Sequence, residues 1–454
     1  MKNYWRQAES TKNYTKPSFK PNSKMNTGKE TFAELKHIHF IGIGGAGTAP
    51  LAGIMLQKGC KISGSDLVSN KQTEQLRRAG GQIFEGHAAA NLPPETQLLV
   101  YSSAAAGDNP ELLKAAELNI PCMRRGEFLA KLASLYPRAV AVCGSHGKTT
   151  ITAMLVWIMR ECAIPCTYLI GGKVNSFPAY GTADSDIFIS EADESDGTNA
   201  LFFPFIGVVS NVEDDHSWSV GGTEALMANF ARFARQSENL IYYPDDRSFE
   251  LFRNHPGACP FSNGSFAEYR EIKFNGFMKT DAVFACFAAE KLGIVRTAAV
   301  RAVNKFPGVA RRMTVHFESP NLTLIEDYAH HPTEVARSIE LLRQNYPKHH
   351  LRVVFQPHRY ARLEKYLDAF AHELGRADSV FTVPVFAAWT EKSQVNSRML
   401  AERTGAQAVD LDLNWTEMPA IILKDRPQKL LIAVLGAGDV EKLIPELKTQ
   451  IPGG

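Results

Sequence analysis

The chain has 454 residues, 44% of them hydrophobic, with 50 lysine and arginine residues against 48 acidic ones. The length predicts about three domains with buried cores, which excludes a disordered protein. The formal net charge of +2, and apolar runs far shorter than the roughly 20 residues of a membrane span, predict neither nucleic-acid binding nor membrane insertion. Seven cysteines without a C-x-x-C pair indicate thiols in a reducing compartment, so we expect a cytoplasmic protein.

Residues 1–30 are polar and lysine-rich and lack apolar periodicity, a composition typical of a flexible tail. Met25 lies near the end of this segment. We therefore predict that residues 1–24 are dispensable, so that a chain beginning at Met25 keeps its activity.

From His37 onward, apolar β-type runs alternate with helical patterns, which predicts βα units around parallel sheets. The predicted strands are His37–Ile43, Leu98–Ser102, Ala139–Val142, Ile187–Ser190, Ile206–Ser210, Leu322–Asp327, Leu351–Phe355, Ser379–Val383 and Leu430–Leu435. Two segments, Leu135–Arg138 and Phe306–Arg312, have the composition of domain borders. The predicted organisation is a flexible tail at 1–30 and three domains at 31–136, 137–307 and 308–454.

The first glycine-rich loop follows the first predicted strand. Its glycines at 42, 44 and 47 fit the pattern G-x-G-x-x-G, and Asp66 follows at about the spacing of the next strand end. Alone the motif is weak, because the same turn accepts the pyrophosphate of NAD or of a UDP-sugar. The segment Tyr101–Ala104 either lines the same crevice or is a plain strand-to-helix connection.

The second glycine-rich loop, GSHGKTT at residues 144–150, lies between an apolar strand and a helical pattern. Backbone N–H groups of such a turn and helix start bind phosphate, Lys148 adds a positive charge, and Thr149 offers a hydroxyl to Mg²⁺. The loop differs from the general pattern G-x-x-x-x-G-K-[ST], because Val142 stands where the first glycine is expected. It predicts ATP or GTP binding; a chance surface turn is the alternative.

Acidic residues follow two neighbouring strands of the predicted central domain, in Ile189–Asp196 and Ser210–His216. The carboxyl ends of neighbouring strands in an open sheet meet at one edge, beside the phosphate loop. Most of these acids are expected to be solvated or to cap helices. We predict that Glu191 and His216, together with Thr149, surround Mg²⁺ there.

Ten short motifs in order along residues 36–442 resemble those of the Mur ligases. They are GIGGAG at 42–47, GSD at 64–66, YSSA at 101–104, GSHGKTT at 144–150, EADESD at 191–196, SNVEDDH at 210–216, RR at 311–312, DYAHHPTE at 327–334, FQPHRYAR at 355–362 and GAGDV at 436–440. The resemblance implies an α/β fold in three domains: a Rossmann-like N-terminal domain for a UDP-sugar, a central P-loop ATPase-type domain, and a Rossmann-like C-terminal domain for an amino acid. FQPHRYAR favours the branch that joins L-alanine to UDP-N-acetylmuramate in peptidoglycan synthesis, with ATP and Mg²⁺.

The resemblance also implies roles for individual residues. The catalytic ones are Lys148, His216, Arg312, Asp327 and Arg359. The nucleotide would contact Gly144, Ser145, His146, Gly147, Lys148, Thr149, Thr150, Asp281 and Arg311, and the magnesium ligands would be Thr149, Glu191 and His216. The UDP-sugar would contact Gly42, Gly44, Gly45, Gly47, Asp66, Ser102 and Ser103. The amino acid would contact Tyr328, His331, His358, Arg359 and Arg362.

The chemistry of amide formation agrees with these roles. A carboxylate is a poor acyl donor, so it must first attack the γ-phosphate to form an acyl phosphate, which the amine then opens. Bringing two anions together demands positive charge, which Lys148, Mg²⁺, Arg312 and Arg359 supply by positioning and electrostatic stabilisation. His358 or His331 is the expected acceptor of the amine proton. Closure of the domains would exclude water from the acyl phosphate.

The central domain departs from the family pattern in one motif. The family's G-x-H-N-x-x-N-A, whose asparagines lie near the adenine and phosphates, is replaced by Asn275–Ala282, with Phe277, Met278 and Asp281 at the His and Asn positions. The segment from Asp246 to Phe274 is also shorter. The nucleotide affinity and the base preference therefore stay open. The amine donor also stays open among L-alanine, tripeptide, glycine and L-serine. A non-catalytic paralogue that binds the UDP-sugar is an alternative, and the chain is either a monomer or a homodimer.

Overall fold

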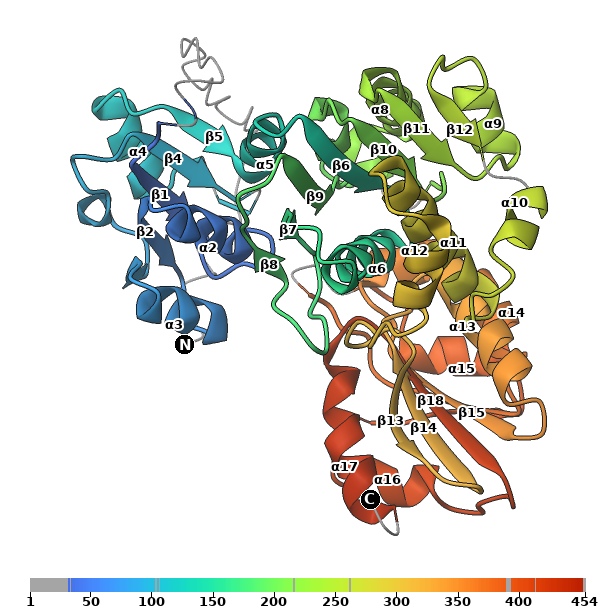
Figure 1. Ribbon diagram of the computed structural model, residues 1–454. Helices are drawn as coiled ribbons and strands as arrows, with labels where there is room; N and C mark the ends of the chain where they lie inside the picture. Colours follow the sequence, from blue (N-terminus) through green and yellow to red (C-terminus); the bar gives the residue numbers. More distant parts are fainter. Residues whose placement is uncertain are drawn as a thin grey trace. The chain divides into compact units, whose positions relative to one another are not determined.

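The computed structural model describes residues 32, 34–102, 104, 105, 107–214, 217–260, 263–388, 393–412 and 414–451. The predicted tail and two predicted site residues, Ser103 and His216, lie outside them. The chain divides into two compact units, Met1–Leu135 and Tyr136–Gly454, which we describe separately (Figure 1). No helix in the described ranges is long and apolar enough to cross a membrane.

The first unit is built on one parallel sheet, which has the strand order β3-β2-β1-β4-β5 among the described residues. The strands are β1 (His37–Ile41), β2 (Lys61–Asp66), β3 (Gln82–Glu85), β4 (Leu98–Tyr101) and β5 (Cys122–Arg124), and the helices are α2 (Ala49–Gln57), α3 (Lys71–Arg78), α4 (Pro110–Glu117) and α5 (Arg125–Ala133). The strand order reverses between β1 and β4, and ligands of open α/β sheets bind at the carboxyl ends of such a strand pair.

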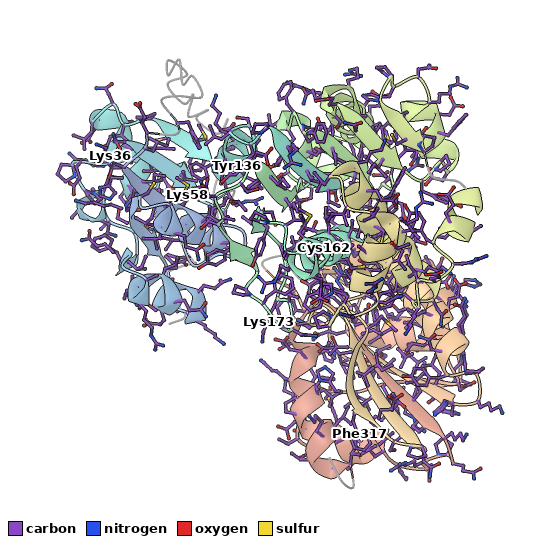
Figure 2. The ribbon with its side chains drawn as sticks, viewed as in Figure 1. Lys36, Lys58, Tyr136, Cys162, Lys173 and Phe317 are labelled. Carbon is purple, nitrogen blue, oxygen red and sulfur yellow. The ribbon has the colours of Figure 1, made fainter. Side chains whose placement is uncertain are left out.

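The second unit begins with a sheet of strand order β12-β11-β10-β6-β9-β7-β8, parallel except for β8 against β7. Its strands are β6 (Arg138–Cys143), β7 (Thr167–Leu169), β8 (Tyr180–Gly181), β9 (Ile187–Glu191), β10 (Ile206–Val209), β11 (Asn239–Tyr242) and β12 (Ala258–Pro260). Its main helices are α6 (Lys148–Glu161), α8 (Thr223–Gln236), α11 (Gly276–Lys291) and α12 (Arg296–Val303). Tyr136, which is labelled in Figure 2, opens the unit. It is buried and donates a hydrogen bond to Thr167 Oγ1 at 3.2 Å.

The last sheet has the order β13-β14-β18-β15-β16-β17, in which β13 is antiparallel to β14. The strands are β13 (Thr314–Glu318), β14 (Leu322–Asp327), β15 (His350–Phe355), β16 (Ser379–Thr382), β17 (Ala408–Asp410) and β18 (Leu430–Leu435), and the main helices are α13 (Pro332–Asn345), α14 (Tyr360–Leu374), α15 (Ser397–Thr404) and α17 (Leu443–Gln450). Every residue of β14 and β18 is buried, as expected for strands covered on both faces.

The predicted α/β architecture and all nine predicted strands are confirmed, with strand ends displaced by at most two residues. Nine further strands in the described part of the chain were not predicted; β5, β7, β8, β12 and β17 have two or three residues, whereas β2, β3, β11 and β13 have four to six. Runs of two or three residues are too short for an alternation pattern. The predicted domain ranges stay predictions.

Candidate active site

The phosphate loop joins the end of β6 to the start of α6. Gly144 and Gly147 have φ angles of +135° and +86°, a region that favours glycine. A Cβ on Gly144 would lie 2.1 Å from Ser210 Oγ, and a Cβ on Gly147 would lie 2.8 Å from Asp281 Oδ1. No described side chain caps the first N–H groups of α6. The loop is therefore a close-packed turn that leaves a 14-residue helix with its N-terminus available to an anion.

Lys148, the first residue of α6, forms a buried ion pair with Glu194. Its Nζ lies 2.9 Å from Glu194 Oε2 and donates to the carbonyl oxygen of Gly144 at 2.6 Å. Burial alone would lower the pKa of Lys148, but the charges of Glu194 and Asp193 raise it. Burial raises the pKa of Glu194 to about 7 against the attraction of the lysine. The phosphate-loop lysine is therefore charged and held by a carboxylate that the sequence analysis did not single out.

Thr149 and Glu191 lie together at the carboxyl edge of the central sheet. Thr149 Oγ1 donates to Glu191 Oε2 at 3.1 Å, and the N–H of Gly171 donates to Oε1 at 2.6 Å. Parallel pairing of β9 with β6 places Glu191 opposite Val142, just before the phosphate loop. Burial raises the pKa of this carboxyl group. A hydroxyl and a carboxylate are hard oxygen donors, so this pair fits Mg²⁺.

His146, in the middle of the phosphate loop, is shared between two carboxylates. Its Nε2 lies 3.2 Å from Glu213 Oε2 and its Nδ1 lies 3.2 Å from Glu334 Oε1. Burial would lower the pKa of His146, but the hydrogen bonds to both carboxylates outweigh burial and raise it to about 9. Glu213 follows β10 and Glu334 is in the first turn of α13, so His146 links the central sheet to the last one.

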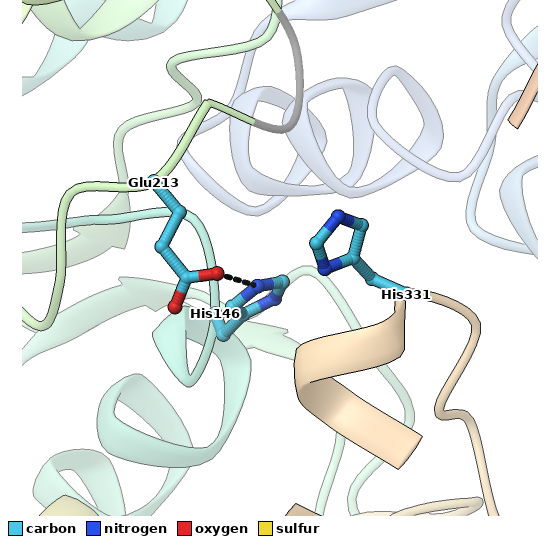
Figure 3. A group of neighbouring side chains, drawn as sticks. All are labelled: His146, Glu213 and His331. Atoms are coloured by element: carbon cyan, nitrogen blue, oxygen red, sulfur yellow. Dashed lines mark hydrogen bonds and ion pairs between the residues drawn. The ribbon is translucent and has the colours of Figure 1, made fainter. Parts of the chain in front are cut away.

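Figure 3 shows His331 beside this pair, with its ring centroid 5.4 Å from that of His146. Ligand atoms of His146, Glu213 and His331 all lie within 4.8 Å of one another, close enough to hold a metal ion. Two imidazoles and one carboxylate suit zinc better than magnesium. Protonated His146, however, donates one ring N–H to each carboxylate, which explains its contacts with Glu213 and Glu334 without a metal.

Arg312 faces a small pocket between the central and last sheets of the second unit. Its Nη1 lies 3.6 Å from Glu334 Oε1, and its guanidinium lies 5.1 Å from the centroid of the Tyr328 ring. The pocket has a volume of about 40 Å³. Its lining residues are His146, Gly147, Thr150, Phe277, Asp281, Arg312, Asp327, Glu334, Arg337 and Ser338. Six of these residues belong to the predicted site: His146, Gly147, Thr150, Asp281, Arg312 and Asp327.

Asp327 and Arg311 are held within the C-terminal part of the unit. The carboxylate of Asp327 accepts hydrogen bonds from the N–H groups of Met313 at 2.8 Å and Ala329 at 3.0 Å. Arg311 is not among the pocket residues: its Nε donates to Glu326 at 2.8 Å and its Nη2 to the carbonyl oxygen of Gly436 at 2.7 Å. Of the two adjacent arginines, only Arg312 therefore lines the pocket, while Arg311 ties down the loop after β18.

The residues predicted to face the amino acid divide into two groups. His358 stacks on Phe386, with centroids 5.6 Å apart and rings 14° from parallel, and meets the edge of His330 at 5.6 Å. Arg362 Nη1 lies 3.4 Å from His358 Nδ1, and the N–H of Arg359 donates to the carbonyl oxygen of Phe386 at 2.8 Å. Burial and the neighbouring cations lower the pKa of His358 to about 3.

His358 is therefore a neutral ring inside a cationic cluster, and Tyr328 joins the cluster by an edge contact with His330 at 5.3 Å. His331 lies apart from it, beside His146 and Tyr366. Phe386 was not predicted, and an aromatic residue in a connecting segment gives no sequence signal for such a role.

In the first unit, the G-x-G-x-x-G loop turns back on the ends of β1 and β2. Gly42 has a φ of +71°, and a Cβ there would lie 3.0 Å from Ser102 Oγ. The N–H of Gly44 donates to Asp66 Oδ2 at 2.8 Å. The structure thus places the predicted residues Gly42, Gly44, Asp66 and Ser102 around one turn, in which Asp66 itself stabilises the backbone of the loop.

Three carboxylates that the sequence analysis did not assign complete the second unit's site: Glu194, Glu213 and Glu334. Each lies inside a motif quoted above, so a signal was present. Glu334 has the most contacts, because it also accepts a hydrogen bond from the N–H of His330 at 2.9 Å. Its pKa is well below its usual range, since the charges of His330 and His146 outweigh burial.

Three protein-family models together match most of the chain. Residues 37–137 match the model of the Mur ligase family, catalytic domain; residues 142–269 match the Mur ligase middle domain; and residues 311–440 match the Mur ligase, glutamate ligase domain. Two relatives are named UDP-N-acetylmuramate–L-alanine ligase. That of Myxococcus xanthus is 31% identical over 90% of this chain and 94% of its own, and that of Saccharopolyspora erythraea is 32% identical over 92% and 94%.

A solved structure of a UDP-N-acetylmuramate-alanine ligase from Thermotoga maritima has the same fold. It superposes with a TM-score of 0.74 at 23% identity and covers 91% of this chain and 98% of its own. The family models and the full-length relatives agree with one another and with the three sheets described above. The chain belongs to the Mur ligase family.

Proposed function

We propose that this chain is an ATP-dependent ligase that joins L-alanine to the carboxylate of UDP-N-acetylmuramate through an acyl phosphate, in the cytoplasmic synthesis of peptidoglycan precursors. The observation that supports it most strongly is the match, over 90% of the chain, to relatives named for that reaction. The cluster of Lys148, Thr149 and Glu191 at the N-terminus of α6 supports the phosphoryl-transfer step.

The triphosphate would lie on the loop Gly144–Gly147 and on the first N–H groups of α6. Lys148, now paired with Glu194, would turn to the phosphate oxygens. Thr149 and Glu191 would hold Mg²⁺ together with His216, as the sequence predicts. Bound there, Mg²⁺ would neutralise charge on the transferring phosphoryl group.

Arg312 would stabilise the charge that develops as the sugar carboxylate attacks, because it lines the pocket beside Gly147. Asp327 would act as a positioning residue, since its carboxylate fixes the backbone of Met313 next to Arg312. The loop Gly42–Gly47 with Ser102 would bind the pyrophosphate of the UDP-sugar in the first unit.

Arg359 and Arg362 would bind the carboxylate of the amino acid, beside the neutral ring of His358. An imidazole with a pKa of about 3 is too weak a base to take up the amine proton at neutral pH, so we assign acceptance of that proton to His331 and not to His358. Because Nδ1 of the neutral His358 ring accepts from Arg362, its Nε2–H would donate a hydrogen bond to the carboxylate of the amino acid.

Mass spectrometry of the reaction products tests the proposal. Purified protein with ATP, Mg²⁺, UDP-N-acetylmuramate and a mixture of L-alanine, L-serine, glycine and L-alanyl-γ-D-glutamyl-diaminopimelate should yield UDP-N-acetylmuramoyl-L-alanine. A Lys148→Ala variant should form this product at least about 100-fold more slowly. An adduct with another amine would show that this amine, and not L-alanine, is the donor. Binding of the UDP-sugar without any adduct would point to a non-catalytic paralogue.

A further inference from the structure

His146, Glu213 and His331 bring three potential metal ligands together at the phosphate loop (Figure 3). One ligand atom of each residue lies within 4.8 Å of those of the other two. His146 stands in the loop before α6, Glu213 follows β10, and His331 immediately precedes α13. The three ligands therefore come from segments far apart in the sequence, which meet only through the packing of the second unit.

The two closest of these ligand atoms already have the spacing that zinc requires. Nε2 of His146 lies 3.2 Å from Oε2 of Glu213. Zinc binds nitrogen and oxygen ligands at about 2.0–2.2 Å in a tetrahedron, so that neighbouring ligand atoms are roughly 3.3 Å apart. A zinc ion between these two atoms therefore needs little movement of either side chain. A ring nitrogen of His331 has to approach by at most about 1.5 Å to reach the same spacing.

The groups behind these ligands are those that orient ligands in zinc sites. A histidine that binds a metal usually donates its other ring N–H to a carboxylate, which fixes the ring. The second nitrogen of His146, Nδ1, faces Glu334 Oε1 at 3.2 Å. The carboxylate of Glu213 accepts a hydrogen bond from Thr333 Oγ1 at 2.9 Å and another from Arg337 at 3.3 Å. Both ligands are thus oriented by contacts that do not depend on a metal.

The donor set distinguishes this cluster from the predicted magnesium site. Magnesium prefers six oxygen ligands in an octahedron, as the hydroxyl of Thr149 and the carboxylate of Glu191 could in part supply. Two imidazoles and one carboxylate favour zinc instead. Three protein ligands leave a fourth position for water, which is the arrangement of an open zinc site.

Zinc and a proton compete for Nε2 of His146. A metal ligand must present a lone pair, so the imidazole has to lose the hydrogen on Nε2, whereas it keeps the hydrogen on Nδ1. In the metal-free chain, the two carboxylates hold both ring hydrogens of His146. Binding of zinc therefore releases a proton from Nε2 and keeps the hydrogen bond to Glu334.

We propose that His146, Glu213 and His331 form an inhibitory zinc site, in which the metal replaces the Nε2 proton of His146 and ties the phosphate loop to the start of α13. Zinc withholds His146 from the nucleotide and His331 from the amine proton, so turnover stops while the metal stays bound. The inhibition rests on the proposed function, whereas the binding of zinc does not.

Cobalt(II) is the spectroscopic probe for this site, because it takes the ligands of zinc and absorbs visible light strongly when it is four-coordinate. The full chain, titrated with Co²⁺ in excess Mg²⁺, should develop these absorption bands, and Zn²⁺ should abolish them. His331→Gln should weaken Zn²⁺ binding at least about 10-fold, since even the loss of a group behind a metal ligand has an effect of this size. His146→Gln should do the same, and thermal unfolding shows whether each variant is folded.

His372→Gln is the matched control, because this histidine is 79% exposed and lies outside the cluster. It should leave the affinity for Zn²⁺ unchanged. A change of less than about 10-fold in both folded cluster variants would overturn the site. Thiolate charge-transfer absorption in the near ultraviolet would also overturn it, because the cobalt would then be bound by the free cysteines.

The inhibition is tested by product formation with ATP, Mg²⁺, UDP-N-acetylmuramate and L-alanine. Zn²⁺ should stop the reaction at the concentration that displaces Co²⁺, and a zinc-selective chelator should restore it. Ligation that continues with zinc bound at the cluster would overturn the inhibitory role and keep the proposed function. Zinc binding that depends on His146 and His331, without any ligation in the metal-free chain, would support the site and remove the proposed function.

Discussion

Loss of the proton that charges His146 between Glu213 and Glu334 should destabilise the second unit in alkaline solution. Both carboxylates lie 3.2 Å from ring nitrogens, and the His146 side chain is only 5% exposed. The charged imidazole ring is therefore stabilised by the two carboxylates and not by solvent. Replacing it in His146→Gln keeps a hydrogen-bonding side chain but removes the charge between the two carboxylates.

The magnitude follows from the pKa of His146, which the fold raises from 6.5 to about 9. At about 1.4 kcal/mol for each tenfold change in proton affinity, this corresponds to about 3 kcal/mol of folding free energy. Because the folded pKa lies above the unfolded one, the contribution is fully present below pH 6.5 and is lost as the pH rises through about 9. For the unit Tyr136–Gly454, it amounts to about 5 °C in Tm.

The assay is thermal unfolding by calorimetry at a series of pH values on both sides of the folded pKa of His146. Wild type should lose about 5 °C more than His146→Gln between the acidic and alkaline ends, because only wild type releases this proton. His372→Gln is the control, since that histidine is 79% exposed and contacts Glu373 only at 3.9 Å. Parallel pH profiles for wild type and His146→Gln would refute a charged His146 between the two carboxylates.

Three further substitutions test the site. Lys148→Ala should reduce turnover at least about 100-fold, measured by product formation, while calorimetry shows unchanged binding of the UDP-sugar to the first unit; surviving turnover would contradict the role of the loop. Glu194→Gln should tighten AMP-PNP binding by up to about tenfold, because a charged hydrogen bond worth roughly 1.5–3 kcal/mol then competes less for Lys148; weaker binding would show that Glu194 helps to hold the nucleotide. Phe386→Leu should raise the KM for L-alanine by about 2- to 10-fold with a smaller change in kcat, because an aromatic contact worth roughly 0.5–1.5 kcal/mol no longer orients His358; a purely kcat effect would contradict this.

The sequence predicted the elements that depend on local pattern. Strands such as β6 and β14 are short apolar runs bounded by turn residues, and the phosphate loop carries its own glycines and lysine. Periodicity contains no information on which charged groups meet across a long separation. Glu334 contacts His146 from 188 positions away along the chain, so its role emerged only with the packing of α13 against the loop.

Adjacent residues with the same chemistry show a second limit of prediction from the sequence. Nothing in the pair Arg311-Arg312 tells which guanidinium faces the pocket. The backbone decides: Arg311 has a φ of +61° and Met313 a φ of +47°, and Asp327 holds the N–H of Met313. Left-handed conformations of non-glycine residues are sparsely populated and persist only where surrounding contacts enforce them. Arg312 therefore owes its orientation to a carboxylate on β14.

The cations of the second unit's site are paired with carboxylates in this structure. Lys148 is held by Glu194, His146 by Glu213 and Glu334, Arg337 by Glu213, and Arg312 lies near Glu334. A triphosphate, like these carboxylates, carries negative charge on oxygen acceptors, so its binding would be an exchange of anions at fixed cations. The affinity for a nucleotide is then the difference between two strong sets of contacts.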